Sequence, residues 1–273
     1  MRRPALSRRP HYRPTAFSPI KLLRLAVFAV LLPLIFGCGG LERLPPAPVA
    51  LSEQITVLGI PNAHFWPDTQ GAEILREWGE SLKREQTTEH VMAGPDGRLP
   101  PAAFLAISGG GDDGAFGAGL LSGWSARGTR PNFKLVTGVS TGAMMAPFAF
   151  LGHAYDDKLR AMFTQIGQND IYKERPIYSV LFSDSLADTT PLFSLISRYL
   201  DETMIADIAR EYKKGRLLLI GTTNLDVQRP VIWNIGAIAA SGHPGALELI
   251  RKILLASAAM PGFFPPVMVE VEP

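Results

Sequence analysis

The residues best suited to covalent chemistry surround Ser140, in the run Gly138-Val139-Ser140-Thr141-Gly142. A nucleophilic serine is most exposed on a sharp turn between a strand and a helix, where flanking side chains would collide with the backbone. Gly138 and Gly142 supply the room, because glycine has no Cβ and accepts positive φ angles. At a helix start, the hydroxyl would also lie near free N–H groups and the positive end of the helix dipole. The pattern therefore predicts a nucleophile elbow.

A second glycine turn comes earlier in the chain and is suited to hold negative charge. Ser108–Gly111 reads Ser-Gly-Gly-Gly and opens the next helical pattern. Bare backbone N–H groups at such a place stabilise an oxyanion or bind a phosphate. No Gly-Lys-Ser/Thr follows the glycines, and the next strand ends at Thr137 and Gly138 without a ribose-binding acid. Phosphate-loop and dinucleotide sites are therefore disfavoured, and the two turns together indicate acyl transfer.

The elements that position these turns follow from the spacing of apolar residues. Phe104–Ile107 and Phe133–Val136 are short apolar runs typical of buried strands, and each leads through a glycine turn into a helical pattern. This order predicts an α/β fold. The first helix is expected to have an apolar face formed by Phe116, Leu120, Leu121 and Trp124. Further strands are expected at 55–60, 217–222, 231–235 and 267–271, helices at 72–83, 156–166, 192–200, 203–214 and 244–258, and a surface loop at 168–190.

Three motifs together resemble the patatin-like phospholipase family: Gly109–Gly114, Gly138–Gly142, and Ala256–Pro266 with the sequence ASAAMPGFFPP. The resemblance extends from about Phe104 to the end of the chain. It implies a three-layer α/β/α sandwich with a mostly parallel central sheet. It also implies a Ser–Asp dyad that hydrolyses lipid acyl esters without a catalytic histidine. No cluster of His, Cys, Asp or Glu has the spacing of metal ligands, so neither a metal nor a cofactor is expected.

The resemblance implies a role for individual residues: Ser140 as nucleophile, the amides of Gly109, Gly110 and Gly111 as oxyanion hole, and Gly114, Gly138 and Gly142 as motif glycines. Asp113 departs from the pattern, since the family often has Arg or Lys there. The family's catalytic aspartate belongs to an Asp-Gly-Gly/Ala motif beyond Phe-Phe-Pro-Pro, and the sequence ends at Pro273 without it. We therefore expect a chain truncated before its catalytic aspartate, with little activity in this form.

Two alternatives remain at this point. A conventional hydrolase needs a serine, an acid and a histidine in that order, and Asp226 and His243 after Ser140 satisfy it. Ser241–Pro244 nevertheless also has the composition of a turn before a helix. The other alternative is a catalytically inactive, membrane-anchored lipoprotein. His64 is expected to have a capping or packing role.

The first 37 residues resemble the signal peptide of a bacterial lipoprotein. Seven basic residues from Arg2 to Arg24 occur with no acid before Glu42, and Leu25–Phe36 is an uninterrupted apolar run. This run fits a signal-peptide core but is short for a membrane span. Cys38, the only cysteine, follows directly. The resemblance implies cleavage before Cys38 and attachment of lipid to its sulfur, which would hold the protein on a membrane.

Four regions result: a signal peptide at 1–37, a proline-rich tether at 38–53, an N-terminal extension at 54–100, and a C-terminally incomplete patatin-like domain at 101–273. Gly39, rather than Asp, after the cysteine indicates the outer membrane of the cell envelope. The expected partners are a lipid or phospholipid acyl ester and the membrane surface reached through Cys38. A net charge of +2 argues against a nucleic-acid partner.

Overall fold

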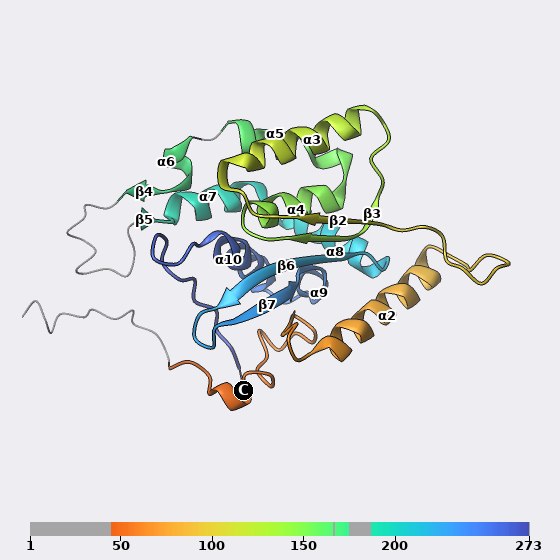
Figure 1. Cartoon of the computed structure of the whole chain (residues 1–273), viewed down its shortest axis with the longest axis horizontal. Coiled ribbons are helices and arrows are strands. Elements are labelled where there is room, and N and C mark those ends of the chain that lie inside the picture. Colours follow the sequence, from red (N-terminus) through yellow and green to blue (C-terminus); the bar gives the residue numbers. More distant parts are fainter. Residues whose placement is uncertain (1–44, 166, 175–186, 273) are drawn as a thin grey trace, which may run out of the picture.

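A five-stranded sheet organises the fold, in the strand order β1-β7-β6-β3-β2, with a separate pair β4-β5 (Figure 1). The structure is a computed structural model that describes residues 45–165, 167–174 and 187–272. The strands are β1 (His64–Phe65), β2 (Ala103–Ile107), β3 (Phe133–Gly138), β4 (Lys173–Glu174), β5 (Ala187–Asp188), β6 (Leu217–Asn224) and β7 (Arg229–Asn234).

Helices make up most of the remaining described residues. The α-helices are α2 (Gly71–Thr88), α3 (Gly114–Ala126), α4 (Thr141–Leu151), α5 (Asp156–Thr164), α6 (Gln168–Ile171), α7 (Thr190–Tyr199), α8 (Glu202–Lys213), α9 (Ile235–Ala240) and α10 (Ala246–Ala258). Short 3-10 turns are η1 (Val49–Leu51), η2 (Gly111–Asp113) and η3 (His153–Tyr155).

The centre of the sheet is parallel and one side of it is antiparallel. β2 pairs with β3, and β3 with β6, in parallel register. β7 returns beside β6 as a hairpin, and β1 adds an antiparallel strand beyond β7. The helix α3 connects β2 to β3, and α4 follows β3 directly. The expected mostly parallel α/β fold is confirmed, and residues 64–88 from the predicted extension contribute β1 and α2 to it.

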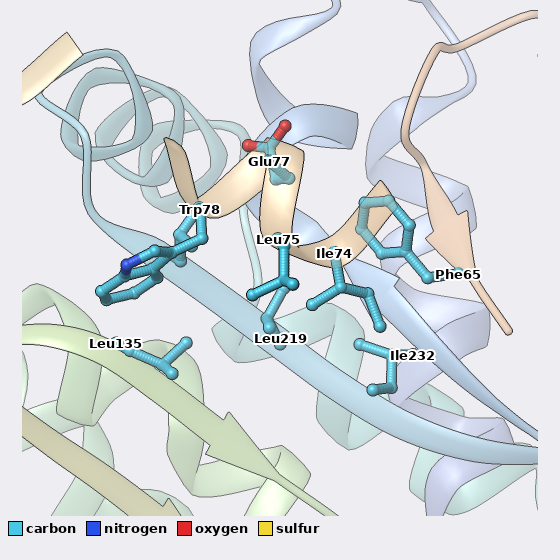
Figure 2. Close-up of a pocket in the computed structure, with 9 residues that line it drawn as sticks. Phe65, Ile74, Leu75, Glu77, Trp78, Leu135, Leu219 and Ile232 are labelled. Carbon is cyan, nitrogen blue, oxygen red and sulfur yellow. The ribbon is translucent and has the colours of Figure 1, made fainter. Parts of the chain in front are cut away.

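The two faces of the sheet are covered by different helices. Alternate residues of a strand point to opposite faces. Leu135, Leu219 and Ile232 point toward α2 (Figure 2). Their neighbours Val136 and Leu218 are fully buried on the other face, where α4, α9 and α10 contact the strands. The result is a helix–sheet–helix arrangement in which α2 forms one outer layer.

Two predicted strands are wrong. The segments 55–60 and 267–271 are not strands; the chain there forms an isolated antiparallel bridge between Thr56 and Glu272. Val57 and Ile60 are nevertheless buried in the core. Their apolar character therefore reflects packing of an irregular segment, which a short sequence pattern does not distinguish from a strand.

Other element boundaries also differ from the expectation. Ile235, predicted as the end of a strand, begins α9, a helix that was not predicted. The Asn234 side chain caps α9 by accepting a hydrogen bond from the Ala237 amide at 3.1 Å. Asp156 begins α5 but does not cap it, because its carboxylate pairs with Arg130 at 2.7 Å. The predicted loop at 168–190 contains α6, β4 and β5 in its described part.

His64 packs among aromatic rings, in agreement with its predicted packing role. Its ring centroid lies 6.1 Å from that of Trp66 and 5.5 Å from that of Trp233. Burial lowers the pKa of His64 because the charged imidazolium would lose its hydration.

We predict that protonation of His64 destabilises the fold at mildly acidic pH. Below about pH 6.5, His64 is protonated in the unfolded chain, whereas burial disfavours its protonation in the folded chain. The free energy of unfolding therefore falls as the pH decreases from about 7 to about 5. In the variant His64→Phe, the free energy of unfolding should fall less over the same pH range. Urea titrations across that pH range measure it, and an identical slope for both proteins would contradict the prediction.

Candidate active site

Ser140 occupies a strained turn between β3 and α4. Gly138 ends β3 and Thr141 begins α4, so the serine lies on the sharp bend between them. Its backbone angles are φ 55° and ψ −125°. A positive φ is uncommon for a residue with a Cβ, and such strain costs on the order of 1–3 kcal/mol and persists only where the surroundings impose it. The predicted elbow geometry is therefore present in the structure.

The glycines on either side of Ser140 permit a very close approach of three backbone segments. A Cβ on Gly138 would collide with the carbonyl of Gly142, and a Cβ on Gly142 would collide with the carbonyl of Ile107 at the end of β2. Backbone atoms cannot move aside as a flexible side chain can. These two positions consequently exclude every side chain, which is why the elbow requires glycine at both.

The glycine turn after β2 lies directly against the elbow. A Cβ on Gly109 would be 2.9 Å from the Cβ of Ser140. The Val139 amide donates to the Ile107 carbonyl at 3.2 Å, and the Thr141 hydroxyl donates to the Gly111 carbonyl at 3.1 Å. Parallel neighbours β2 and β3 thus bring both predicted motifs to the same edge of the sheet. Gly114 also fits this contact, since a Cβ there would collide with the Thr141 side chain.

The backbone amides of Gly109, Gly110, Gly111 and Thr141 at this edge have no partner in the described part of the chain. The Gly142 and Ala143 amides are already bonded to the carbonyls of Val139 and Ser140. The Thr141 amide was not singled out from the sequence, although the residue after an elbow serine commonly supplies an oxyanion donor. The glycine-turn amides and that of Thr141 form a candidate oxyanion hole beside Ser140.

Two arginines stabilise the far end of the elbow helix. In α4, Gly142 to Phe150 are all buried, so its last carbonyl groups cannot reach water. Arg130 donates to the Ala149 carbonyl at 3.0 Å, and Arg216 donates to the Phe150 carbonyl. The cations also lie at the negative end of the helix dipole, where positive charge is favourable. Their effect is to fix a helix whose other end carries Ser140.

The predicted histidine alternative is not brought to the elbow. The His243 imidazole accepts the Gly245 amide at 3.0 Å within its own turn, just before α10 begins. Ser257, at the other end of α10, contacts the elbow, and the helix between them spans about 17 Å at 1.5 Å per residue. In the described part of the chain, the Ser140 hydroxyl makes no hydrogen bond with a carboxylate or an imidazole. Asp113 is exposed in η2.

Apolar side chains are exposed close to the site. Val139, adjacent to Ser140, is 51% exposed, and Met260, just after α10, is 59% exposed. Phe116 and Leu120 in α3 are 77% and 58% exposed. Of the apolar face expected for this helix, only Leu121 is buried, and it forms the buried face of α3 together with Gly114 and Ala118. Small residues let this helix pack closely, which leaves its larger side chains outside.

A separate cavity lies on the opposite face of the sheet. It has a volume of about 330 Å³, and Ile74, Leu75 and Trp78 of α2 form its roof above the strands (Figure 2). Glu77 also borders it, but its carboxylate points away from Leu75 and is bonded to Arg84 at 2.9 Å. The cavity is almost wholly apolar and lies across the sheet from α4. The nucleophile and this cavity therefore belong to different sites.

Within residues 45–165, 167–174 and 187–272, no group of three or more His, Cys, Asp or Glu residues is arranged to hold a metal ion. No helix of the same residues is long and apolar enough to span a membrane. Cys38, the predicted lipid-attachment residue, lies outside the described residues.

An elbow serine beside a glycine turn, on adjacent parallel strands, defines an α/β protein with a candidate site for serine acyl transfer. Residues 105–273 match the family model of patatin-like phospholipases, and the chain belongs to this family. Comparison with curated proteins gives no match.

Two solved structures show a distant likeness. VipD from Legionella pneumophila shares 13% identity over 67% of this chain and 50% of its own, with a TM-score of 0.37. ExoU from Pseudomonas aeruginosa, crystallised with SpcU, shares 17% identity over 61% of this chain and 39% of that one, with a TM-score of 0.31. The chain therefore spans half or less of these proteins.

We predict that Gly142→Ala disrupts the elbow. The added methyl group would meet the Ile107 carbonyl, so β2 and α4 must separate and stability should fall by about 1–3 kcal/mol, as for other overpacked sites. Thermal unfolding measures the loss. The matched control is Gly119→Ala in α3, where nothing lies within 4 Å of the new Cβ and alanine is the better helix former. Equal stability of the two variants would contradict the close approach.

Proposed function

We propose that the protein is a lipid acyl hydrolase that cleaves phospholipid or lysophospholipid esters through Ser140. The strained elbow at Ser140, adjoining the unpaired amides of the glycine turn and of Thr141, is the observation that carries the proposal. The serine oxygen attacks the ester carbonyl carbon, the alcohol leaves, and water then hydrolyses the acyl-enzyme. Membership of the patatin-like phospholipase family supports this class of substrate.

The amides of Gly110, Gly111 and Thr141 would stabilise the tetrahedral intermediate. Negative charge develops on the carbonyl oxygen when Ser140 attacks, and each well-placed donor contributes about 3–4 kcal/mol to transition-state stabilisation. The Gly109 amide, also expected from the sequence, adjoins them. The exposed apolar residues Val139 and Met260 suit acyl chains that approach the serine from a lipid phase.

The general base in this proposal is an aspartate, as the family resemblance implies. No Asp-Gly pair follows Ser140 in residues 141–273. The proposal therefore assigns the base to none of the aspartates in residues 141–273. The aspartate would accept the Ser140 proton during attack and return it to the leaving alcohol.

We also propose that the protein is anchored to the bacterial outer membrane through lipid on Cys38. The basic and apolar leader before this single cysteine supports the proposal. A lipid anchor would hold the hydrolase at the surface that contains its substrate, and the proline-rich tether at 38–53 would allow it to reach that surface.

We predict that Ser140→Ala abolishes ester hydrolysis, with a loss of at least about 10⁴-fold in kcat, because it removes the hydroxyl that attacks the ester. The intact gene product, including any sequence that continues beyond Pro273, is assayed with p-nitrophenyl butyrate and with phospholipid vesicles. His243→Ala is the control and should retain nearly full activity. Residual turnover in Ser140→Ala, or a comparable loss in His243→Ala, would refute the proposed site.

Replacement of the anchoring residue tests the location. Cys38→Ser should prevent incorporation of labelled palmitate and leave an unprocessed or soluble product, since no other thiol is present. Metabolic labelling and membrane fractionation measure both effects. The proposal fails if the variant still incorporates palmitate and sediments with the outer membrane.

A further inference from the structure

One hydroxyl outside the elbow makes direct contact with the nucleophile's backbone. Ser257 lies in the last turn of α10, 117 residues after Ser140. Its oxygen accepts the Ser140 amide at 2.9 Å and donates to the Gly221 carbonyl of β6 at 2.7 Å. The direction of both bonds is fixed, because an amide N–H only donates, a carbonyl only accepts, and a hydroxyl can do both.

This contact satisfies the Ser140 amide, which the local backbone leaves without a carbonyl partner. The amides of Val139, Gly142 and Ala143 find carbonyl partners nearby. The positive φ of Ser140 turns its amide out of that local pattern, so a partner must come from elsewhere in the fold. Ser257 supplies it and links the elbow to β6 through a single side chain.

The Ser257 contact distinguishes the Ser140 amide, which is hydrogen-bonded, from the unpaired amides at the same edge of the sheet. Because the Ser140 amide is occupied by Ser257, it is not available to an oxyanion, whereas the Gly110, Gly111 and Thr141 amides are. The orientation of the Ser140 backbone relative to these donors therefore depends on where α10 ends.

We propose that Ser257 is a positioning residue for acyl transfer, which holds the Ser140 backbone at the orientation needed for attack. The expected effect of Ser257 on catalysis rests on the proposed function, whereas its contact with the Ser140 amide does not. A displacement of the nucleophile by about 1 Å lowers the rate of reaction by about 10²-fold without a matching effect on binding. Loss of the Ser257 hydroxyl should therefore reduce kcat and leave KM nearly unchanged.

The test uses the intact gene product and variants that differ only in the hydroxyl. Ser257→Ala should lower kcat for p-nitrophenyl butyrate by about 10²-fold, with KM within about twofold of wild type. Ser257→Thr keeps a hydroxyl and should retain most of the wild-type kcat. Ser257→Val, whose side chain has the shape of threonine but no hydroxyl, should not. Ser122→Ala is the control, because the Ser122 hydroxyl bonds only to the Ala118 carbonyl within α3, at 2.9 Å.

Several outcomes would overturn the inference. They are a kcat for Ser257→Ala within about threefold of wild type, an equal kcat for the Thr and Val variants, or a loss confined to KM. If the Ala variant does not fold, the comparison of Thr with Val decides the question. Wild-type protein that hydrolyses no ester would instead refute the proposed function.

A measurement independent of activity reads out the contact itself. Amide hydrogen exchange at Ser140 should be slow in the wild type and in Ser257→Thr, and faster in Ser257→Val, because only a hydroxyl protects the amide. Equal exchange in all three proteins would show that Ser257 does not hold the elbow. This result remains interpretable even if no substrate is found.

Discussion

The close approach of three backbone segments at Ser140 is the constraint on which the rest of the site depends. The end of β2, the elbow and the first turn of α4 lie so close that Gly138 and Gly142 can carry no side chain. Van der Waals repulsion thereby fixes the path of the chain, and the positive φ of Ser140 follows from it. The proposed oxyanion amides are near the serine because of this contact, and they come from two different loops.

A strained turn must be held by its surroundings, and the fold does so from both ends of α4. Burial of nearly the whole helix fixes its position in the core. Arg130 and Arg216 satisfy its final carbonyl groups, which are otherwise costly to bury. At the first turn, Ser257 bonds the amide that the strained geometry leaves over. Apolar burial and a few directed polar contacts thus act together on the element that carries the nucleophile.

The sheet separates the reactive edge from the cavity beneath α2. Strand alternation sends Leu135 and Leu219 to one face and Val136 to the other. The helices around Ser140 cover the second face, while the cavity opens on the first. An apolar cavity alone is therefore a poor guide to the site in this fold, because the chemistry lies where parallel strands end and helices begin.

The sequence by itself determined the elbow, the glycine turn and the order of strands and helices that carries them. These features depend on short-range rules: glycine where backbones crowd, and apolar runs where strands are buried. The strands at 55–60 and 267–271 were predicted wrongly, because over a few residues a buried irregular segment has the same apolar sequence pattern as a strand. Spacing placed Phe116 and Leu120 on one apolar face with Leu121, but only the tertiary structure decided that this helix buries its small residues and exposes Phe116 and Leu120.

Only the tertiary structure decided which distant groups meet Ser140. Ser257 and His243 are both polar residues near the ends of α10, and no local pattern tells which end reaches the elbow. The path of α10 across β6 places Ser257 against the Ser140 amide and leaves His243 beyond the opposite end of the helix, which spans about 17 Å. Contacts of this kind depend on how whole helices and strands pack together. The residues that meet can be more than a hundred positions apart in the chain, so no periodic pattern in the sequence indicates them.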